Sequence, residues 1–200
     1  MKKAIVVGGA GALGRAIVKE LKAVSIAPIS IDISSNDDAD HNLLVKPNTP
    51  LHLQYKGIWT ELNKHLIGAS VPGVFCAAGG WMGGSIGDEN FLEVLDQMNA
   101  MNLATAALSA NLSVRLLSQE GILVLTGAEA ALSECPTMIS YGASKVSTHY
   151  LVASIAKDET FNKKSAKAFA ILPSVIDTPT NRQFMPNADH GSWTKVRCDA

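Results

Sequence analysis

Short runs of Val, Ile and Leu alternate along this chain with longer segments in which apolar residues recur every three or four positions. The short runs predict buried strands and the longer segments predict helices, because apolar side chains repeat with the period of the element that buries them. Strands that alternate with helices are typical of a parallel sheet with helices on both faces. We therefore predict an α/β fold with three layers, formed by residues 1–200 as a single domain.

The pattern places six strands and four long helices. The strands are predicted at residues 3–7, 27–31, 43–46, 73–77, 121–125 and 167–172, and the helices at residues 12–24, 51–67, 88–118 and 139–157. In the third helix an apolar stripe reaches Met98, and its next step of four falls on Asn102. A buried amide must find hydrogen-bond partners, so Asn102 is either a core residue bonded to nearby backbone or part of a functional site.

Composition excludes several classes of protein. Of 200 residues, 47% are hydrophobic and 18% charged, and the net charge is -1, which indicates a folded core and no basic block for nucleic acid or an anionic membrane surface. No segment has the roughly 18 apolar residues of a membrane span. Cys76, Cys135 and Cys198 are too far apart for a CxxC pair, which suggests free thiols in a reducing cytoplasm.

Residues 34–42 gather three aspartates and a histidine, and a metal site is one interpretation of them. They lie in a run of turn-forming residues between two strands, which favours a solvated loop. The other histidines lack the spacing of paired ligands, so no metal is predicted; they are His52, His65, His149 and His190.

A glycine-rich turn joins the first strand to the first helix and places Gly8, Gly11 and Gly14 at intervals of three. Glycine at this place permits a tight turn and lets the backbone approach a pyrophosphate, which the amino end of the helix then binds. A purely structural turn is the alternative. Asp32 ends the second strand, where a carboxylate can accept both adenosine ribose hydroxyls and repel a 2′-phosphate. With no Lys or Arg in residues 33–45, the sequence favours NADH over NADPH.

Tyr141 and Lys145 lie one helical turn apart and therefore on the same helix face. A tyrosine has a pKa of about 10, and a neighbouring cation favours its ionised form. The pair could then act as a general acid beside a bound ligand. An exposed pair without a function is the alternative.

Taken together, these residues resemble the short-chain dehydrogenase/reductase family. The resemblance covers nearly the whole chain and rests on the glycine turn, Asp32, Ala77-Ala78-Gly79, Asn102-Leu103, Tyr141 with Lys145, and residues 173–178. It implies a Rossmann fold with strand order 3-2-1-4-5-6. It also implies that Tyr141 donates a proton, that Lys145 binds the nicotinamide ribose and lowers the tyrosine pKa, and that Asn102 supports the proton relay.

The cofactor-binding residues expected from the motifs and the resemblance are Gly8, Gly11, Ala12, Leu13, Gly14, Asp32, Ile33, Ala78, Gly79, Gly80, Tyr141, Lys145, Pro173, Val175 and Thr178.

Four stretches resemble the dihydropteridine reductase group of that family, namely residues 76–84, 125–132, 138–145 and 172–194. This resemblance implies hydride transfer from NADH to quinonoid dihydropteridine, which regenerates tetrahydrobiopterin. Trp81 is expected to stack on the pterin substrate, or else to plug the cleft beside the cofactor. The alternative functions are a reductase of another quinonoid or carbonyl substrate and a catalytically silent dinucleotide-binding protein.

Two features depart from the wider family. Most members carry a catalytic serine about thirteen residues before the tyrosine, where this chain has Ala128, and the nearest hydroxyl belongs to Thr126. The absence of this serine argues against alcohols and ketones as substrates and suits an electron-poor quinonoid pterin as the substrate. Relatives also continue past residue 194 with a helix and a seventh strand, so we expect the sixth strand to form an exposed sheet edge here.

Two further expectations concern contacts. Small residues in the third helix would let another helix approach closely, within the subunit or across a twofold axis; they are Ala104, Ala106, Ala107 and Ala110. The resemblance implies a homodimer formed through the helices that carry Asn102 and Tyr141. Asn181 and Arg182 are expected either to contact substrate or to make hydrogen bonds within their loop.

Overall fold

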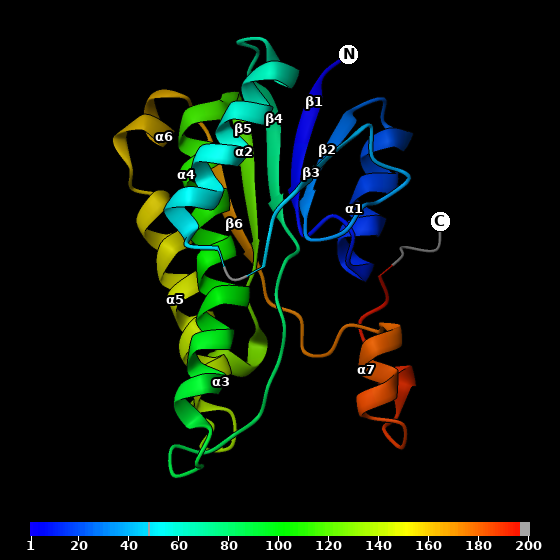
Figure 1. Ribbon diagram of the computed structural model, residues 1–200, viewed down its shortest axis with the longest axis vertical. Coiled ribbons are helices and arrows are strands. Elements are labelled where there is room, and N and C mark those ends of the chain that lie inside the picture. The colour runs from blue at the N-terminus through cyan, green and yellow to red at the C-terminus, as the bar shows by residue number, and fades with distance from the viewer. Residues whose placement is uncertain (48, 197–200) are drawn as a thin grey trace.

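Figure 1 shows the protein as a computed structural model, which describes residues 1–47 and 49–196. A parallel sheet with strand order β3-β2-β1-β4-β5-β6 forms its centre. The strands are β1 (Lys3–Val7), β2 (Ala27–Asp32), β3 (His41–Leu44), β4 (Val71–Cys76), β5 (Leu117–Thr126) and β6 (Lys167–Ile171). The predicted fold class and strand order are confirmed.

Helices cover both faces of this sheet (Figure 1). They are α1 (Ala12–Ala23), α2 (Leu51–Leu66), α3 (Phe91–Met98), α4 (Ala104–Leu116), α5 (Ile139–Ile155), α6 (Glu159–Lys163) and α7 (Pro179–Phe184). Crossovers between parallel strands are right-handed, and the chain moves across the sheet in one direction from β1 to β2 and in the other direction from β4 to β5 and β6. As a result, α1 packs on one face, whereas α4 and α5 pack on the other with α2 beside α4.

The core follows from strands that are apolar on both faces. Ile29 and Leu123 are fully buried in the larger cluster, which α2, α4 and α5 complete on their side of the sheet. Val6 and Val18 belong to a smaller cluster beneath α1. Burial on two faces explains why β1 is a nearly continuous apolar run and why Ser30, the polar residue in the middle of β2, is buried as well.

The helix predicted over residues 88–118 is interrupted. Between α3 and α4 the backbone forms a π-helix, Asn99–Leu103, which contains Asn102. A π-helix inserts one residue into the α-helical period and is often found at functional sites. The polar residue that broke the apolar stripe therefore coincides with a change in the backbone.

The carboxyl-terminal part contains two short helices that the apolar pattern did not predict. Asp158 caps α6 by accepting hydrogen bonds from the N–H groups of Thr160 and Phe161. Thr178 caps α7, and Pro179 occupies its first turn. Short helices of this kind are defined by capping and not by periodicity, which is why the apolar pattern missed them.

Among the described residues, β6 forms an edge of the sheet, as predicted. Its Phe169 and Ile171 side chains are 47% and 40% exposed. The predictions for residues 197–200, including a free thiol at Cys198, lie outside the described residues.

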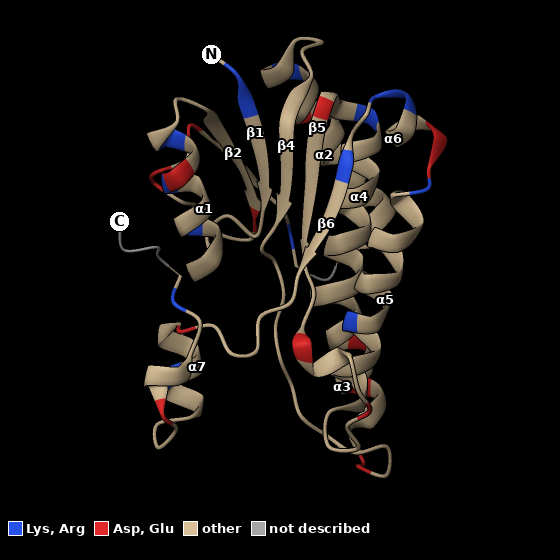
Figure 2. Cartoon of the chain, turned by 180° about the vertical axis from the view of Figure 1, so that it is seen from behind, with Lys and Arg blue, Asp and Glu red and all other residues tan. Residues whose placement is uncertain are grey.

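Neither a membrane span nor a metal cluster is found in the described part of the chain. Its helices are too short or too polar to cross a membrane. Residues 1–47 and 49–196 contain no group of three His, Cys, Asp or Glu side chains placed to hold a metal ion. Charged residues are distributed over many elements (Figure 2), in keeping with the absence of a basic block in the sequence.

Candidate functional site

The predicted site residues gather at the carboxyl ends of the central strands. β1 and β4 are neighbours, and the chain leaves them toward opposite sides of the sheet. Such a switch point is where open α/β sheets bind ligands. Ala77 and Ala78 both donate backbone N–H bonds to the Val7 carbonyl, so the turn after β4 lies against the glycine turn after β1.

The glycine turn depends on two glycines for its own folding. Gly8 has φ +83°, and a Cβ at this position would overlap the backbone of Ala78. A Cβ on Gly14 would overlap the Gly8 carbonyl. These two positions therefore need glycine to bring the turn, the first helix and the β4 turn together.

Gly11 differs from these two glycines. It precedes α1 in an extended conformation, and an added Cβ would find only the Gly8 carbonyl, at an ordinary 3.6 Å. The protein itself does not require glycine here, which leaves room for a ligand at the amino end of α1. Ala12 and Leu13 begin that helix, whose free N–H groups can bind an anion.

Asp32 lies beside the glycine turn. One carboxylate oxygen accepts the Ala10 N–H at 2.9 Å, and the other accepts the Ile33 N–H at 2.6 Å. The acid at the end of β2 is thus fixed against the turn, and its contact with a ribose stays a prediction. Ile33 itself is 62% exposed, beyond the end of the strand.

Two residues that support the turn were not predicted. Arg15 donates to the carbonyls of Ala10 and Ser35 and to the Asn36 side chain. Asn36 is fully buried and donates from its side chain to the Gly9 carbonyl. The interpretation of residues 34–42 as a solvated loop is therefore wrong at Asn36, because the polar side chain is used to fasten the glycine turn. A turn-forming Asn gives no sequence signal for this role.

Asn102 connects three segments of the site. Its side-chain oxygen accepts the Gly80 N–H at 3.0 Å, and its amide nitrogen donates to the Gly80 carbonyl and to the Ser144 hydroxyl. A Cβ on Gly79 would lie 2.7 Å from the Asn102 oxygen and 3.3 Å from the Lys145 ammonium. The segment that contains Ala78, Gly79 and Gly80 is therefore held between the π-helix and α5.

Lys145 is almost completely buried, with 4% of its surface exposed. Its ammonium donates to the Thr126 carbonyl at the end of β5, at 2.8 Å. Burial lowers the pKa of Lys145 to about 8, and the nearby Cys76 thiol opposes that change. A cation with a depressed pKa in a site lined by backbone groups is characteristic of functional positions.

Tyr141 lies one turn before Lys145, and its ring centroid is 5.9 Å from the ammonium. Burial raises the pKa of Tyr141 above its ordinary value of 10.0. This direction is opposite to the lowering that the sequence analysis assigned to Lys145. In the structure the Lys145 ammonium is bonded to the Thr126 carbonyl, and the desolvation of the phenol raises the tyrosine pKa.

Trp81 lies in the segment that follows β4 and is 57% exposed. Its ring packs against Gly83, whose added Cβ would lie 3.3 Å from it. Stacking on the pterin and plugging the cleft beside the cofactor both stay predictions for Trp81. The side chain is available to a flat ligand at the mouth of the site.

The segment after β6 contacts the segment after β5 at Pro173, whereas Val175 and Thr178 make their hydrogen bonds within residues 175–194. The Pro173 carbonyl accepts the Glu129 N–H, and the Val175 carbonyl accepts the Thr194 N–H. The Thr178 hydroxyl accepts the Asn181 N–H as the cap of α7. The Asn181 side chain donates to the Ile176 carbonyl, so its bond is made within its own loop.

Arg182, in the same segment, donates two hydrogen bonds to the Asp177 carboxylate. With Asn181 it thus matches the expectation of hydrogen bonding within the loop. Both bonds to Asp177 stabilise the turn that precedes α7.

Three known proteins are similar to this chain in sequence or in fold. The dihydropteridine reductase of Dictyostelium discoideum is 39% identical over 195 residues, which cover 98% of this chain and 83% of the relative. A short-chain dehydrogenase/reductase from Serratia marcescens matches the fold with a TM-score of 0.78 at 21% identity, covering 98% of this chain and 85% of that one. BdcA in complex with NADPH matches with a TM-score of 0.72 at 17% identity, covering 90% and 73%.

No protein-family model matches the chain. The identity to the Dictyostelium discoideum protein nevertheless extends over nearly the whole sequence, and the solved structures show the same fold. The resemblance stated from the motifs is therefore confirmed. The chain belongs to the dihydropteridine reductase group of the short-chain dehydrogenase/reductase family, whose members are NAD(P)H-dependent oxidoreductases.

Proposed function

We propose that this protein uses NADH to reduce quinonoid dihydropteridine to tetrahydropteridine, with Tyr141 as the proton donor. One observation carries the proposal: α5 places Tyr141 and Lys145 on one face, at the carboxyl edge of the sheet, beside the segment that Asn102 holds. A proton donor, a cation and a fixed backbone segment thus lie next to a glycine turn suited to a pyrophosphate.

The residues at this edge fit a nicotinamide dinucleotide. The amino end of α1 offers N–H groups to the pyrophosphate, and the open space at Gly11 lets it approach. Asp32, held by two backbone N–H groups, would accept the adenosine ribose hydroxyls. When bound, the dinucleotide supplies a hydride from its nicotinamide.

The proton for the reaction comes from the protein. A tyrosine whose pKa is raised by burial keeps its proton at neutral pH and can donate it as the substrate accepts a hydride. The product gains one hydride and one proton, and the phenolate regains its proton from solvent. The Lys145 cation stabilises that phenolate while it lasts, because opposite charges at short range attract strongly in a buried site.

Ala128 supports the choice of a pterin as the substrate. Ala128 is 2% exposed and offers no hydroxyl to polarise a carbonyl. The Thr126 hydroxyl donates to the Cys76 carbonyl at 2.8 Å and is engaged within the sheet. A quinonoid pterin is already electron-poor and has less need of such polarisation than a ketone. The site therefore suits the pterin better than the carbonyl substrates of other family members.

NADH is proposed as the cofactor in preference to NADPH. A 2′-phosphate would meet the Asp32 carboxylate, and the Arg15 guanidinium is already bonded to Ala10, Ser35 and Asn36. Turnover of quinonoid dihydropterin measured with NADH and with NADPH tests this preference. A lower KM for NADPH would contradict it.

Replacement of Tyr141 by Phe tests the mechanism. We expect Tyr141→Phe to lower kcat by about 100-fold or more, as is usual for loss of a general acid, while the NADH Kd stays within about twofold. Tyr150→Phe is the matched control, because Tyr150 lies on the same helix and is 73% exposed. A Tyr141→Phe enzyme that keeps its kcat would contradict the proposal, and so would a wild-type protein that binds NADH without oxidising it.

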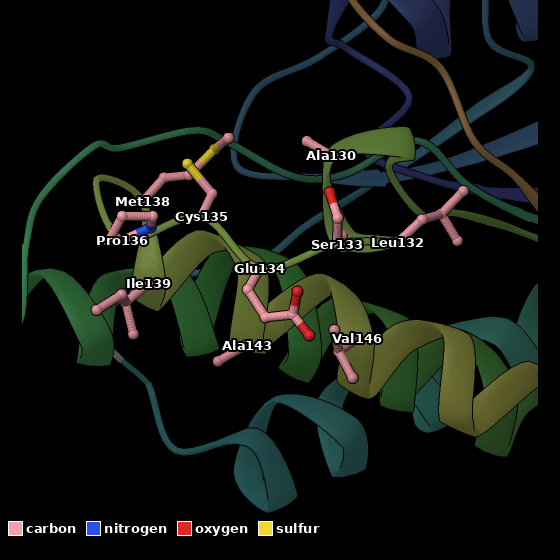
Figure 3. Close-up of a pocket in the computed structure, with 12 residues that line it drawn as sticks. Ala130, Leu132, Ser133, Glu134, Cys135, Pro136, Met138, Ile139, Ala143 and Val146 are labelled. Carbon is pink, nitrogen blue, oxygen red and sulfur yellow. The ribbon is translucent and has the colours of Figure 1, made fainter.

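We also propose a homodimer formed through the outer sides of α4 and α5. Ala106 and Ala110 are buried within the subunit, but Val146 on α5 is 51% exposed. A cavity of about 450 Å³ lies between residues 130–138 and α5, with Val146 in its lining (Figure 3). Exposed apolar surface beside a hollow of this size suits a contact with a second helix.

The oligomeric state tests this interface. Val146→Glu is expected to convert the dimer to a monomer in sedimentation analysis, since a buried unpaired carboxylate opposes association. Val24→Glu is the matched control, because Val24 is 66% exposed at the end of α1. A wild-type monomer, or a Val146→Glu protein that remains dimeric, would contradict the proposed interface.

The cytoplasm is the proposed location. Cys76 and Cys135 are free thiols, the first buried and the second partly exposed. Free thiols persist in a reducing compartment. Fractionation of cells that express the tagged protein would test this.

A further inference from the structure

His149 lies one turn beyond Lys145 and two turns beyond Tyr141 on the same face of α5. The site described above does not use it. Its ring reaches the segment that follows β5, where Ala128 stands at the position of the serine in other family members. The contacts at this point are close and specific.

The Nε2 atom of His149 accepts a hydrogen bond from the Ala128 N–H at 3.2 Å. An imidazole nitrogen can accept only when it carries no proton, so this bond requires the neutral ring with its hydrogen on Nδ1. Ala128 is 2% exposed, and its N–H would lose its partner if the ring were removed or protonated.

The ring is packed directly on Gly127. A Cβ at that position would lie 2.5 Å from Nε2 of His149 and 2.6 Å from the Leu172 side chain. Any larger residue at 127 would push the ring away from the Ala128 N–H. Gly127 and His149 therefore form one contact, in which the small residue admits the ring.

α5 holds two successive points of the backbone after β5. Lys145 binds the Thr126 carbonyl, and His149 binds the Ala128 N–H. Between them, the Gly127 N–H donates to the Ile171 carbonyl of β6 at 2.9 Å. Residues 126–128 are thus fixed from two sides, by β6 and by α5, and α5 is the helix that also carries Tyr141.

We propose that His149 is a positioning residue, which holds residues 127 and 128 at the distance from Tyr141 that the substrate ring requires. This inference rests on the proposed function and adds to it. The usual serine hydroxyl is absent, so the backbone at Ala128 forms that wall of the substrate site, and the neutral imidazole fixes it. The expected consequence is a role in substrate KM and not in dinucleotide binding.

The surroundings of His149 make the neutral form the stable one. Burial lowers the pKa of His149 below its ordinary value of 6.5, and the Lys145 cation lowers it further. Lys145 is the charged group that bears on the ring within the described chain; the segment after β5 faces it with Gly127 and the Ala128 N–H, and Leu172 faces it after β6. In mild acid the protonated ring would present an Nε2–H donor to the Ala128 N–H, which is also a donor. The hydrogen bond would then be lost and residues 127 and 128 would be released.

Two substitutions of His149 test the inference. His149→Leu fills the space but cannot accept a hydrogen bond, whereas His149→Gln places an amide oxygen near the position of Nε2. We expect His149→Leu to raise the KM for quinonoid dihydropterin by about three- to tenfold, the range for one lost hydrogen bond, with an unchanged NADH Kd. His149→Gln is expected to restore the KM. His52→Leu, an exposed histidine on α2, is the matched control.

The pH profile separates positioning from a purely structural role. As the pH falls below the ordinary histidine pKa of 6.5 and the His149 ring takes up a proton, the KM of the wild-type enzyme should rise. The KM of His149→Gln should stay flat over the same range, because glutamine does not titrate. The inference would be overturned if the KM rose at acidic pH in both the wild-type enzyme and His149→Gln. Equal KM values for the Leu and Gln variants would also overturn it.

A measurement without turnover keeps this result distinct from the proposed function. In ¹⁵N-labelled protein, the amide resonances of Gly127 and Ala128 should shift with the titration of the His149 ring. A protein that shows this coupling but reduces no pterin would contradict the proposed function alone. Amide resonances that ignore the ring titration would contradict the inference whatever the activity.

Discussion

Replacement of Lys145 by Met removes a buried cation while keeping a chain of similar length and volume. Lys145 is 4% exposed and has a pKa of about 8, whereas an unfolded lysine titrates at 10.5. The folded state thus disfavours the charged form. The difference of 2.5 pKa units corresponds to about 3 kcal/mol at neutral pH.

The sign follows from proton linkage. Between pH 8 and 10.5 the unfolded lysine still holds its proton while the folded one has released it, so the free energy of unfolding rises with pH in this window. Relative to Lys145→Met, the wild-type protein should gain about 2 kcal/mol between pH 7 and pH 9.5, because the penalty for burying the charge is progressively relieved. The lost bond to the Thr126 carbonyl adds an offset that does not depend on pH.

Urea denaturation of both proteins at several pH values in this range measures the effect. The difference between their unfolding free energies is the useful quantity, because Cys76, whose pKa is raised by burial, titrates in both proteins and largely cancels. Stability curves that run parallel from pH 7 to pH 9.5 would refute the reasoning. They would mean that water reaches the ammonium and that its pKa is close to the ordinary value.

Two predictions concern glycines. Gly14→Ala should lower the free energy of unfolding by about 1–3 kcal/mol, because its Cβ would overlap the Gly8 carbonyl. Gly11→Ala should lower it by less than about 1 kcal/mol and should mainly weaken NADH binding. Urea denaturation and NADH titration separate the two effects, and equal losses of stability would contradict the distinction. Gly57→Ala, on the exposed side of α2 where a Cβ meets nothing within 4 Å, should raise stability by about 0.5–1 kcal/mol and the Tm by about 2 °C. A lower Tm would show that Gly57 has a contact that the free subunit lacks.

The sequence by itself determined the architecture of this protein. Buried strands and amphipathic helices carry their own periods, so the alternation of elements predicted a parallel sheet. The spacing of Gly8, Gly11 and Gly14 and the four-residue step from Tyr141 to Lys145 are also local properties. A single helical turn or a single strand-to-helix connection expresses them, whatever the rest of the chain does.

Tertiary structure decided which partners these residues meet. Asn36 fastens the glycine turn and His149 holds Ala128 because folding brings together segments that are 27 and 21 residues apart. The pKa values of Tyr141 and Lys145 were likewise decided by tertiary structure, since burial depends on elements that pack around the helix. Their spacing predicted a lowered tyrosine pKa, but desolvation raises it. The period of apolar residues and the spacing of motifs are properties of residues that are close in sequence. Solvent exclusion and long-range hydrogen bonds arise only when distant segments pack together in the folded chain.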